Sequence, residues 1–334
     1  MNAKQQLIKT GLCSYGLSGL AFHAPFINDF YGFELTKVLE RTKEKSKITY
    51  PEATIVRSFE ELLSDNELEL IVVNTPTQLH YEMAKNALLA NKHVVLEKPM
   101  CISCSEAKEL VELAEANELI LAVYHNRRLE SGFKTLKKIV DDKTLGDLRY
   151  FKSHFNREKI EIGPKKWKES NLPGSGMFYD LAPHLIDQAL SLFGYPQSID
   201  AKLETQRPHS EVVDYFNLKL GYEQGLIVEL EASMLGQGKD EPKYLLKGAK
   251  GTYQKQNEDH QEDLLRQGIL PSKVDPNKGT ITWLSLEQEQ IPNLRGGYSD
   301  FYSNLFQAIR SNEPLLIKTS EALDVMRIMD EIGD

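Results

Sequence analysis

Over residues 1–125, short apolar runs alternate with longer amphipathic stretches. In this order each strand is followed by a helix, which is typical of a parallel sheet with helices on both faces. The pattern therefore predicts a doubly wound α/β fold for this part of the chain. Strands are expected at Leu7–Cys13, Phe33–Leu39, Thr54–Val56, Leu70–Asn74, His93–Leu96 and Leu119–Val123. Helices are expected at Gly19–Phe30, Phe59–Leu63, Gln78–Asn91 and Ser105–Asn117.

The pattern changes after His125. Longer strand-like runs follow one another there and the helices are set apart from them, as in an α+β domain with a mostly antiparallel open sheet. We therefore place a domain boundary near residue 127. Strands are expected at Val212–Leu220, Leu226–Ala232 and Lys243–Lys247, helices near Phe133–Val140 and Tyr179–Phe193, and an exposed loop at Glu258–Lys278.

Length and charge narrow the class of protein. The 334 residues exceed the ~250 to 300 at which a single core stops growing, so two domains are favoured. The formal net charge of −9 opposes binding to nucleic-acid phosphates and anionic lipids. The longest apolar run that we find, Leu119–Tyr124, is far shorter than the ~20 residues of a membrane helix. With no apolar signal region and only three cysteines, we expect a cytoplasmic protein without nucleic-acid or membrane partners.

A glycine-containing turn follows the first predicted strand, where dinucleotide-binding folds place their phosphate loop. In such a turn Gly16 lets the backbone approach a pyrophosphate, and Gly19 lets the helix pack closely on the strand. Ser14 stands in place of the first glycine of G-x-G-x-x-G. A glycine-rich turn that binds no ligand is the alternative. The residues predicted to contact a dinucleotide are Ser14, Tyr15, Gly16, Leu17 and Ser18.

Two residues of opposite charge follow the second predicted strand, at the position that contacts the cofactor ribose. The carboxylate of Glu40 suits the 2′-hydroxyl of NAD, whereas Arg41, helped by Lys43 or Lys45, suits the 2′-phosphate of NADP. A charged, solvated turn is the third interpretation. The sequence leaves the choice between NAD and NADP open.

Glu97, Lys98 and Pro99 end the fifth predicted strand, whose carboxyl end opens on the ligand crevice of such sheets. A lysine at this place can hold an alcohol or carbonyl oxygen and stabilise negative charge on it. A structural surface lysine is the alternative.

A second group of candidate residues lies on the helix expected near Tyr179–Phe193. Asp180, His184 and Asp187 are spaced i, i+4 and i+7 and therefore share one helix face. A histidine flanked by carboxylates suits a proton acceptor for an alcohol. A helix-capping aspartate and a core histidine are the alternative.

Other chemistries lack their motifs. Cys101 and Cys104 form a CxxC pair, but three cysteines cannot supply a four-thiolate zinc site and the segment has the pattern of an ordinary helix start. No spaced set of His, Asp and Glu suggests a catalytic metal, and the nucleophile-elbow and phosphate-loop motifs of hydrolases and kinases are absent.

Taken together and in order, these motifs resemble the Gfo/Idh/MocA oxidoreductase family over nearly the whole chain. Within it, the chain is most similar to the bacterial branch of NADP-dependent scyllo-inositol dehydrogenases. The family resemblance rests on Gly16–Gly19 with Phe22–Pro25, Thr75 and Pro76 with His80, Lys92–Pro99, and Asp180 with His184. The branch resemblance rests on Tyr124–Arg128, Tyr179–Gln188 and Val213–Phe216.

The resemblance implies a dinucleotide-binding Rossmann domain at 1–127 and a substrate-binding and oligomerisation α+β domain at 128–334. It also implies hydride transfer between a nicotinamide and a sugar or polyol carbon, and a homodimer or homotetramer built through the open sheet. By position, it assigns catalysis to Lys98, Asp180 and His184, cofactor contacts to Thr75, Pro76, His80, Glu97 and Lys98, and substrate contacts to Asn126, Arg127, Asp180 and His184.

The resulting hypothesis is that His184 takes the hydroxyl proton, Asp180 orients its imidazole, and Lys98 holds the oxygen. The sequence does not decide whether Lys98 or His184 is the proton acceptor. Two alternatives remain open: a dehydrogenase of another sugar, such as an aldose or keto-sugar, and a non-catalytic dinucleotide-binding sensor.

Overall fold

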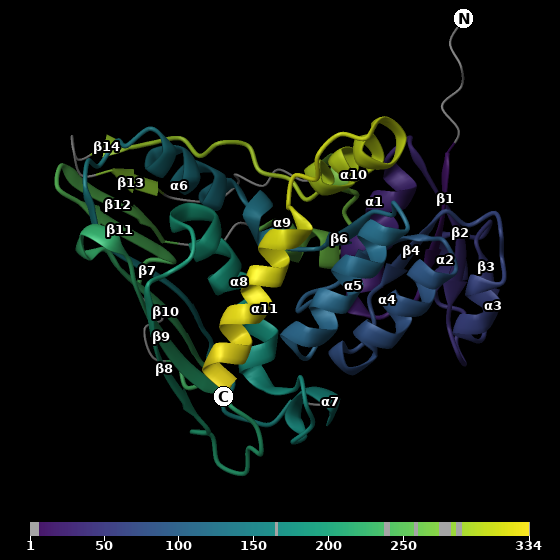
Figure 1. The fold of residues 1–334 in the computed structure, drawn as a ribbon, viewed down its shortest axis with the longest axis horizontal. Helices are drawn as coiled ribbons and strands as arrows, with labels where there is room; N and C mark the ends of the chain where they lie inside the picture. The colour runs from purple at the N-terminus through teal and green to yellow at the C-terminus, as the bar shows by residue number, and fades with distance from the viewer. Residues whose placement is uncertain are drawn as a thin grey trace, which may run out of the picture. The chain divides into compact units, whose positions relative to one another are not determined.

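The computed structural model describes residues 7–163, 166–236, 241–256, 260–273, 282–284 and 289–333, which form two compact units (Figure 1). The first unit comprises residues 1–126, 261–275 and 297–323. The second comprises residues 127–260, 276–296 and 324–334. Two elements cross between these ranges, η3 (Asn126–Leu129) and α11 (Thr319–Gly333).

The first unit is built on a six-stranded parallel sheet with the strand order β3-β2-β1-β4-β5-β6. This order is that of a doubly wound fold, in which the chain starts in the middle of the sheet and winds outward in both directions. The predicted fold class and all six predicted strands are confirmed, and no strand end differs by more than two residues. The strands are β1 (Ile8–Leu12), β2 (Phe33–Leu39), β3 (Thr54–Val56), β4 (Leu70–Val73), β5 (His93–Leu96) and β6 (Leu121–Val123).

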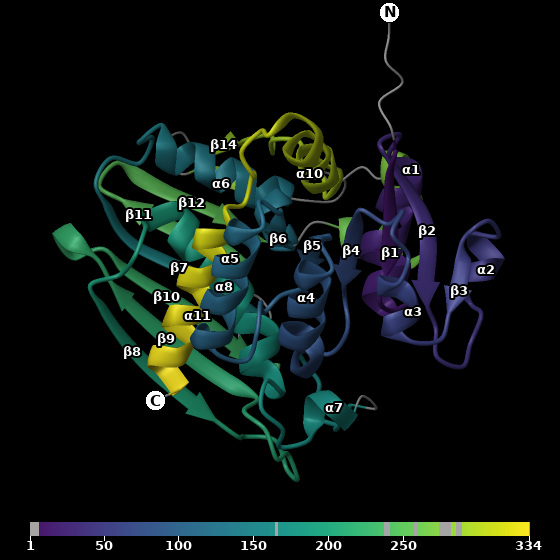
Figure 2. The same ribbon diagram turned by 45° about the vertical axis from the view of Figure 1, so that its right-hand side comes forward.

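The helices of the first unit follow from local signals. Ser103 and Glu106 form a capping box, in which each side chain accepts from the other's backbone amide, and α5 begins there. The first helix starts as a π-helical turn and continues as an α-helix near Pro25, which cannot donate a backbone hydrogen bond. Figure 2 shows α4 and α5 side by side. The helices are η1 (Gly19–His23), α1 (Ala24–Asp29), α2 (Ser46–Thr49), α3 (Phe59–Leu63), η2 (Thr77–Leu79), α4 (His80–Leu89), α5 (Cys104–Ala116), α9 (Gln261–Arg266), η5 (Pro271–Lys273) and α10 (Ser299–Ser311).

The exposed loop predicted at Glu258–Lys278 is wrong within the described residues 260–273. Helix α9 forms there, and the side chains of Gln261 and Leu265 are buried. Gln261 accepts a hydrogen bond from the backbone amide of Tyr298 at 2.7 Å. The segment is mostly polar, so its composition did not indicate that one face of α9 is buried. Residues 257–259 and 274–278 lie outside the described residues.

The second unit contains an eight-stranded sheet with the order β14-β13-β12-β11-β7-β10-β9-β8. Only β7 and β10 pair in parallel among its described strands, so the predicted, mostly antiparallel sheet is confirmed. The strands are β7 (Leu148–Asn156), β8 (Ser198–Glu204), β9 (Tyr215–Gly221), β10 (Ile227–Ser233), β11 (Tyr244–Gly248), β12 (Gly251–Lys255), β13 (Thr282–Leu284) and β14 (Glu289–Gln290). The helices are α6 (Ser131–Asp141), α7 (Lys166–Glu169), α8 (Gly176–Phe193) and η4 (Glu223–Gly225).

Helix α8 packs on β7, β9 and β10 and forms the core of the second unit with them (Figures 1 and 2). Side chains alternate along β9, so Phe216, Leu218 and Leu220 are fully buried while Asn217 and Lys219 point to the other face. One face of this sheet is therefore apolar and covered by α8, and the other is polar.

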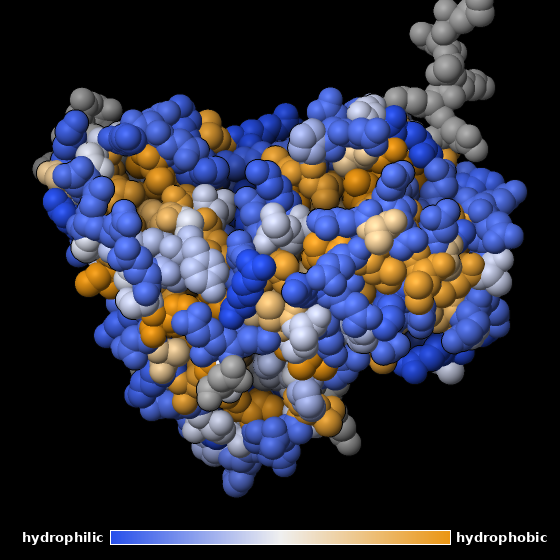
Figure 3. All heavy atoms as spheres, viewed as in Figure 1, coloured by the Kyte–Doolittle hydropathy of each residue, from blue (hydrophilic) through white to orange (hydrophobic). Residues whose placement is uncertain are grey.

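The surface in Figure 3 carries hydrophilic side chains over most of its area, with several separate apolar patches. Within the part of the chain that the structure describes, no helix is long and apolar enough to cross a membrane.

Candidate active site

The turn after β1 is shaped by two glycines and by an asparagine from β4. A Cβ atom on Gly19 would lie 2.1 Å from the backbone oxygen of Ser14, so no other residue fits there. The Ser14 hydroxyl accepts from the Gly16 amide at 3.2 Å. The Asn74 side chain donates to the Ser14 carbonyl at 2.8 Å and to the Ser18 hydroxyl at 3.3 Å. Asn74 was not predicted as a site residue, because it lies 60 residues from the turn that it supports.

This turn fits a dinucleotide. Gly16 and Leu17 are exposed, so a pyrophosphate can reach the backbone at the amino end of the first helix. Beneath the turn, the buried Oδ1 atom of Asn74 has no hydrogen-bond partner among the described residues. An unused buried acceptor costs free energy unless a ligand supplies a donor. The neighbouring Tyr15 packs edge-to-face on Tyr50, with 6.2 Å between ring centroids.

Glu40, predicted as a ribose contact, holds its own loop. Its carboxylate accepts from the backbone amides of Lys45 and Ser46 at 3.0 and 2.8 Å and from the Ser46 hydroxyl at 2.6 Å. Burial alone raises the pKa of the Glu40 carboxyl, but these hydrogen bonds outweigh it and hold that pKa below its usual value. The side chain is buried, whereas Arg41 beside it is exposed.

Arg57 fastens the same loop from β3. Its guanidinium donates to the carbonyls of Glu40 and Lys43 at 2.8 and 2.9 Å and pairs with the Glu44 carboxylate. The loop after β2 is therefore rigidly built, with Arg41, Lys43 and Lys45 on its exposed side.

His80 connects the loops that follow β4 and β5. Its Nε2 atom lies 2.9 Å from the Thr75 carbonyl and its Nδ1 atom 2.8 Å from the Pro99 carbonyl. The ring is fully buried, and burial lowers the pKa of its imidazole. His80 therefore positions the segment of Thr75 and Pro76 against the Lys98–Pro99 turn, whose peptide bond is cis.

Parallel strands place their carboxyl ends at one edge of a sheet, and the predicted cofactor residues of the first unit all follow such ends. They come after β1, β2, β4 and β5. Lys98 is half-buried directly after β5, and Glu97 beside it accepts from the Lys98 backbone amide at 3.2 Å.

In the second unit, α8 carries the predicted catalytic pair. The helix begins at Gly176, three residues earlier than expected, because Ser175 rather than Asp180 occupies the N-cap position. Asp180 and His184 are one turn apart on it, and the Asp180 carboxylate lies 2.7 Å from the Lys168 ammonium group. Asp180 is thus a helix-interior residue held by an ion pair, and not a cap.

Asp187, one turn further along α8, forms a buried bidentate ion pair. The Arg128 guanidinium donates to both of its oxygens, at 2.8 Å from Nε and 2.6 Å from Nη2. Both side chains are almost fully buried. The pair connects the end of η3 to α8, and the i, i+3 spacing places Asp187 on the same helix face as His184.

Two cationic side chains, those of Lys243 and Arg127, contact the ring of Phe155, which lies next to His184. The Lys243 ammonium lies 3.1 Å from the Phe155 ring centroid, the Arg127 guanidinium carbon 5.2 Å, and the His184 ring centroid 6.1 Å. Lys243 also donates to the His154 carbonyl at 2.6 Å. The structure thus brings Arg127 and His184 together around one aromatic ring. Local pattern did not indicate Phe155 or Lys243 as site residues, because β7, which carries Phe155, and β11, which Lys243 directly precedes, are brought together only by the sheet.

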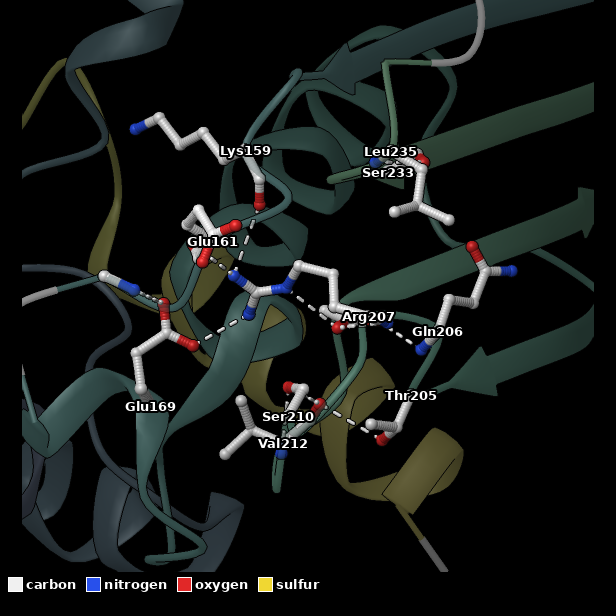
Figure 4. Close-up of polar contacts among 12 residues, drawn as sticks. Lys159, Glu161, Glu169, Thr205, Gln206, Arg207, Ser210, Val212, Ser233 and Leu235 are labelled. Atoms are coloured by element: carbon white, nitrogen blue, oxygen red, sulfur yellow. Dashed lines mark hydrogen bonds and ion pairs between the residues drawn. The ribbon is translucent and has the colours of Figure 1, made fainter.

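Arg207 joins several loops of the second unit, and Figure 4 shows its contacts with Lys159, Glu161 and Glu169. It donates to Asp214 at 2.9 Å, to Glu169 of α7 at 2.7 Å, and to the carbonyls of Lys159 and Glu161 at 3.4 Å. These contacts fix α7, whose Lys168 pairs with Asp180. Figure 4 also shows the Glu169 carboxylate between Arg207 and a backbone amide, which is that of Gly163.

Metal and thiol chemistry find no support in the described residues. They contain no group of three His, Cys, Asp or Glu side chains arranged to hold a metal ion. Burial raises the pKa of the Cys101 thiol, which opposes a reactive thiolate.

Comparison with known proteins matches both halves of the chain. Residues 8–125 match the family described as "Oxidoreductase family, NAD-binding Rossmann fold", and residues 133–254 match the "GFO/IDH/MocA C-terminal domain". The chain is 36% identical to the uncharacterized oxidoreductase YdgJ of Escherichia coli, over 97% of this chain and 94% of that protein. It is 34% identical to the scyllo-inositol 2-dehydrogenase (NADP(+)) IolW of Bacillus subtilis, over 98% and 93%.

A crystal structure of a Bacteroides fragilis protein superposes with a TM-score of 0.86 at 38% identity, covering 98% of this chain and 97% of that one. The chain belongs to the Gfo/Idh/MocA family and is an NAD(P)-dependent dehydrogenase.

Proposed function

We propose that the protein transfers a hydride between a nicotinamide and a secondary alcohol or ketone of a cyclic polyol of the inositol type. The observation that carries this proposal is the pair Asp180 and His184 on one face of α8, combined with Lys98 at the carboxyl end of β5. The likeness to a scyllo-inositol dehydrogenase over nearly the full length supports the substrate class.

The nicotinamide, when bound, supplies the hydride acceptor or donor. In the oxidation direction, His184 takes the hydroxyl proton, and Asp180 orients the imidazole from the preceding turn of α8. The Lys98 ammonium donates to the substrate oxygen and stabilises the negative charge that develops there. The reverse assignment, with Lys98 as proton acceptor, uses the same residues.

The group around Phe155 supports a polyol substrate. Arg127 and Lys243 are held beside His184 by the Glu130 carboxylate and the His154 carbonyl, and charged groups in fixed positions suit a ring with several hydroxyl groups. Asn126 precedes them in the η3 turn. We propose that Asn126 and Arg127 contact the hydroxyl groups that do not react.

The deciding experiment measures absorbance of the reduced nicotinamide with purified protein, NAD or NADP, and a panel of inositols and aldoses. We expect cofactor reduction with at least one inositol. Reduction by aldoses alone would replace the polyol with another sugar substrate. Cofactor binding without turnover in either direction, with keto-inositols tested as well, would favour a sensor.

We propose NADP as the preferred cofactor. The Glu40 carboxylate is buried and occupied by Lys45 and Ser46, so it is not poised to repel a 2′-phosphate, while Arg41 is exposed on the same loop. The NADP dependence printed in the name of the Bacillus subtilis relative agrees with this choice.

We predict that Arg41→Ala weakens NADP binding by ~1 to 3 kcal/mol and leaves NAD binding nearly unchanged, because a charged hydrogen bond to phosphate is lost. Fluorescence titration with both cofactors measures this. Lys47→Ala is the control, since Lys47 is exposed on α2 and donates to the Pro51 carbonyl. Equal losses for NAD and NADP would contradict the role of Arg41.

We also propose a homodimer or homotetramer built through the polar face of the eight-stranded sheet, opposite α8. Asn217, Lys219 and Glu229 lie on this face. We predict that the wild type has two or four times the chain mass of 38.0 kDa and that Asn217→Arg lowers it. Light scattering after size exclusion measures this, with Lys138→Glu on α6 as control; a monomeric wild type would contradict the proposal.

A further inference from the structure

A chain of three polar side chains, two of them fully buried, leads from the interior of the first unit to the residue before Lys98. The Tyr302 hydroxyl of α10 lies 2.7 Å from Nδ1 of His23 in η1, and Nε2 of His23 lies 3.0 Å from Oε1 of Glu97. The other carboxylate oxygen of Glu97 accepts from the Lys98 backbone amide at 3.2 Å. The chain therefore ends on the peptide that carries the predicted catalytic lysine.

The ionised carboxylate of Glu97, together with a neutral imidazole of His23, defines the direction of these hydrogen bonds. An ionised carboxylate only accepts, so Nε2 of His23 carries the proton that bonds to Glu97. In the neutral imidazole, Nδ1 then accepts from the Tyr302 hydroxyl. Donation runs in one direction, from Tyr302 through His23 to Glu97, and hydrogen bonds aligned in this way reinforce one another.

We call the hydrogen-bonded chain of Tyr302, His23 and Glu97 the relay. Packing leaves it little freedom to rearrange. His23 and Tyr302 are fully buried. The Tyr124 ring lies 4.7 Å from the His23 ring, and the Phe26 ring stacks on Tyr302 at 5.7 Å. By contrast, 13% of the Glu97 side chain is exposed, so the relay opens to solvent only at its end beside Lys98.

The relay also keeps a negative charge beside Lys98. Burial raises the pKa of the Glu97 carboxyl, but the hydrogen bond from His23 and the charge of Lys98 lower it below its usual value. Glu97 is thus ionised at neutral pH. Holding a buried carboxylate and two buried polar rings costs free energy that an apolar core avoids, which suggests a role beyond stability.

We propose that Tyr302 and His23 are positioning residues that act through Glu97, fixing the Lys98 peptide and stabilising the charge of its ammonium group during hydride transfer. This inference rests on the catalytic role proposed above for Lys98. It adds His23 and Tyr302 to the residues that act in the reaction. These two residues are 279 positions apart in the sequence.

The test compares His23→Leu, which removes both hydrogen bonds, with His23→Gln, whose side-chain amide retains a donor toward Glu97. We expect His23→Leu to lower kcat by about 10- to 100-fold, since small misplacements of catalytic groups have effects of this size. His23→Gln is expected to recover most of that loss. KM and the cofactor Kd are expected to stay within about twofold, because a positioning role acts on the reacting state.

The pH profile separates positioning from mere structural support. We expect Glu97→Gln to shift the alkaline limb of kcat to lower pH, because the Lys98 ammonium loses the negative charge that stabilises its protonated form. His93→Gln is the matched control. His93 is a histidine at the start of β5, the strand that Glu97 follows, and its Nδ1 atom accepts from the Ile120 amide at the end of the strand opposite Lys98. It is expected to leave kcat and its pH profile unchanged.

A measurement without turnover keeps this inference separate from the proposed function. Nitrogen NMR of the imidazole of His23 is expected to show the proton on Nε2, with a signal that changes in Tyr302→Phe. A proton on Nδ1, or wild-type kcat and pH profile in a folded His23→Leu variant, would overturn the relay. Absence of any dehydrogenase activity in a wild type with the expected NMR signal would count against the role of Lys98 instead.

Discussion

Lys98→Met and His184→Ala are each expected to lower kcat by at least about 100-fold, which corresponds to ~2.7 kcal/mol of lost transition-state stabilisation. Both residues are proposed to contact the oxygen whose proton and charge change in the reaction, so their removal is expected to affect the chemical step more than binding. Steady-state kinetics with the cofactor and polyol found in the panel measures this effect.

The controls separate chemistry from folding. Cofactor binding by His184→Ala is expected to remain within about threefold of wild type, because the predicted cofactor contacts all lie in the first unit and His184 lies on α8 of the second. Lys98 is itself a predicted cofactor contact, so Lys98→Met is compared with wild type at saturating cofactor. Lys108→Met on α5 is the matched lysine control, since its side chain is two-thirds exposed. Near-normal turnover by Lys98→Met and His184→Ala would refute the assignment of both residues.

The fold of the first unit follows closely from local pattern. The run Leu70–Val73 is continuously apolar because β4 is buried on both faces. The sequence identifies such a run as a strand because amphipathic helical stretches lie on either side of it. The start of α5 was equally predictable, since Ser103 and Glu106 have the spacing of a capping box.

The second unit was predicted less completely. Strand β7 was missed because the polar Ser153 lies between Phe151 and Phe155 on its buried face and breaks the apolar pattern there. Its position between β11 and β10 depends on pairing with residues 77 to 100 positions away, from Ile227 opposite Tyr150 to Gly248 opposite Leu148. Such pairings are invisible in a local window.

The candidate site shows the same difference between features that follow from local sequence pattern and features that depend on tertiary contacts. Motif spacing proposed Lys98, Asp180 and His184 as site residues, and it proposed the loop of Glu40 as well. The partners that decide what these side chains do lie elsewhere, and Glu40 bonds to its own loop instead of standing free for a ribose. Asn74 and Arg207 act on the site through contacts far along the sequence. Their roles follow from tertiary structure and not from local pattern.

The other large effect concerns stability, at the ion pair of Arg128 and Asp187. We predict that Arg128→Met lowers the free energy of unfolding by ~3 to 5 kcal/mol, because it removes the counter-charge of a carboxylate that is 1% exposed. Urea unfolding followed by circular dichroism measures this difference. The exposed pair of Lys138 and Asp142 gives the control, since Lys138→Met is expected to cost only ~0.2 to 1 kcal/mol.

The double variant Arg128→Met with Asp187→Leu distinguishes an ion-pair effect from a loss of packing. Replacing both partners by apolar side chains removes the buried charge altogether, so most of the stability is expected to return. A double variant as unstable as Arg128→Met would show that the Arg128 side chain contributes through packing. If stability returns while kcat stays low, the ion pair serves mainly to hold the segment of Asn126 and Arg127 against the helix that carries His184, which is the role that its geometry favours.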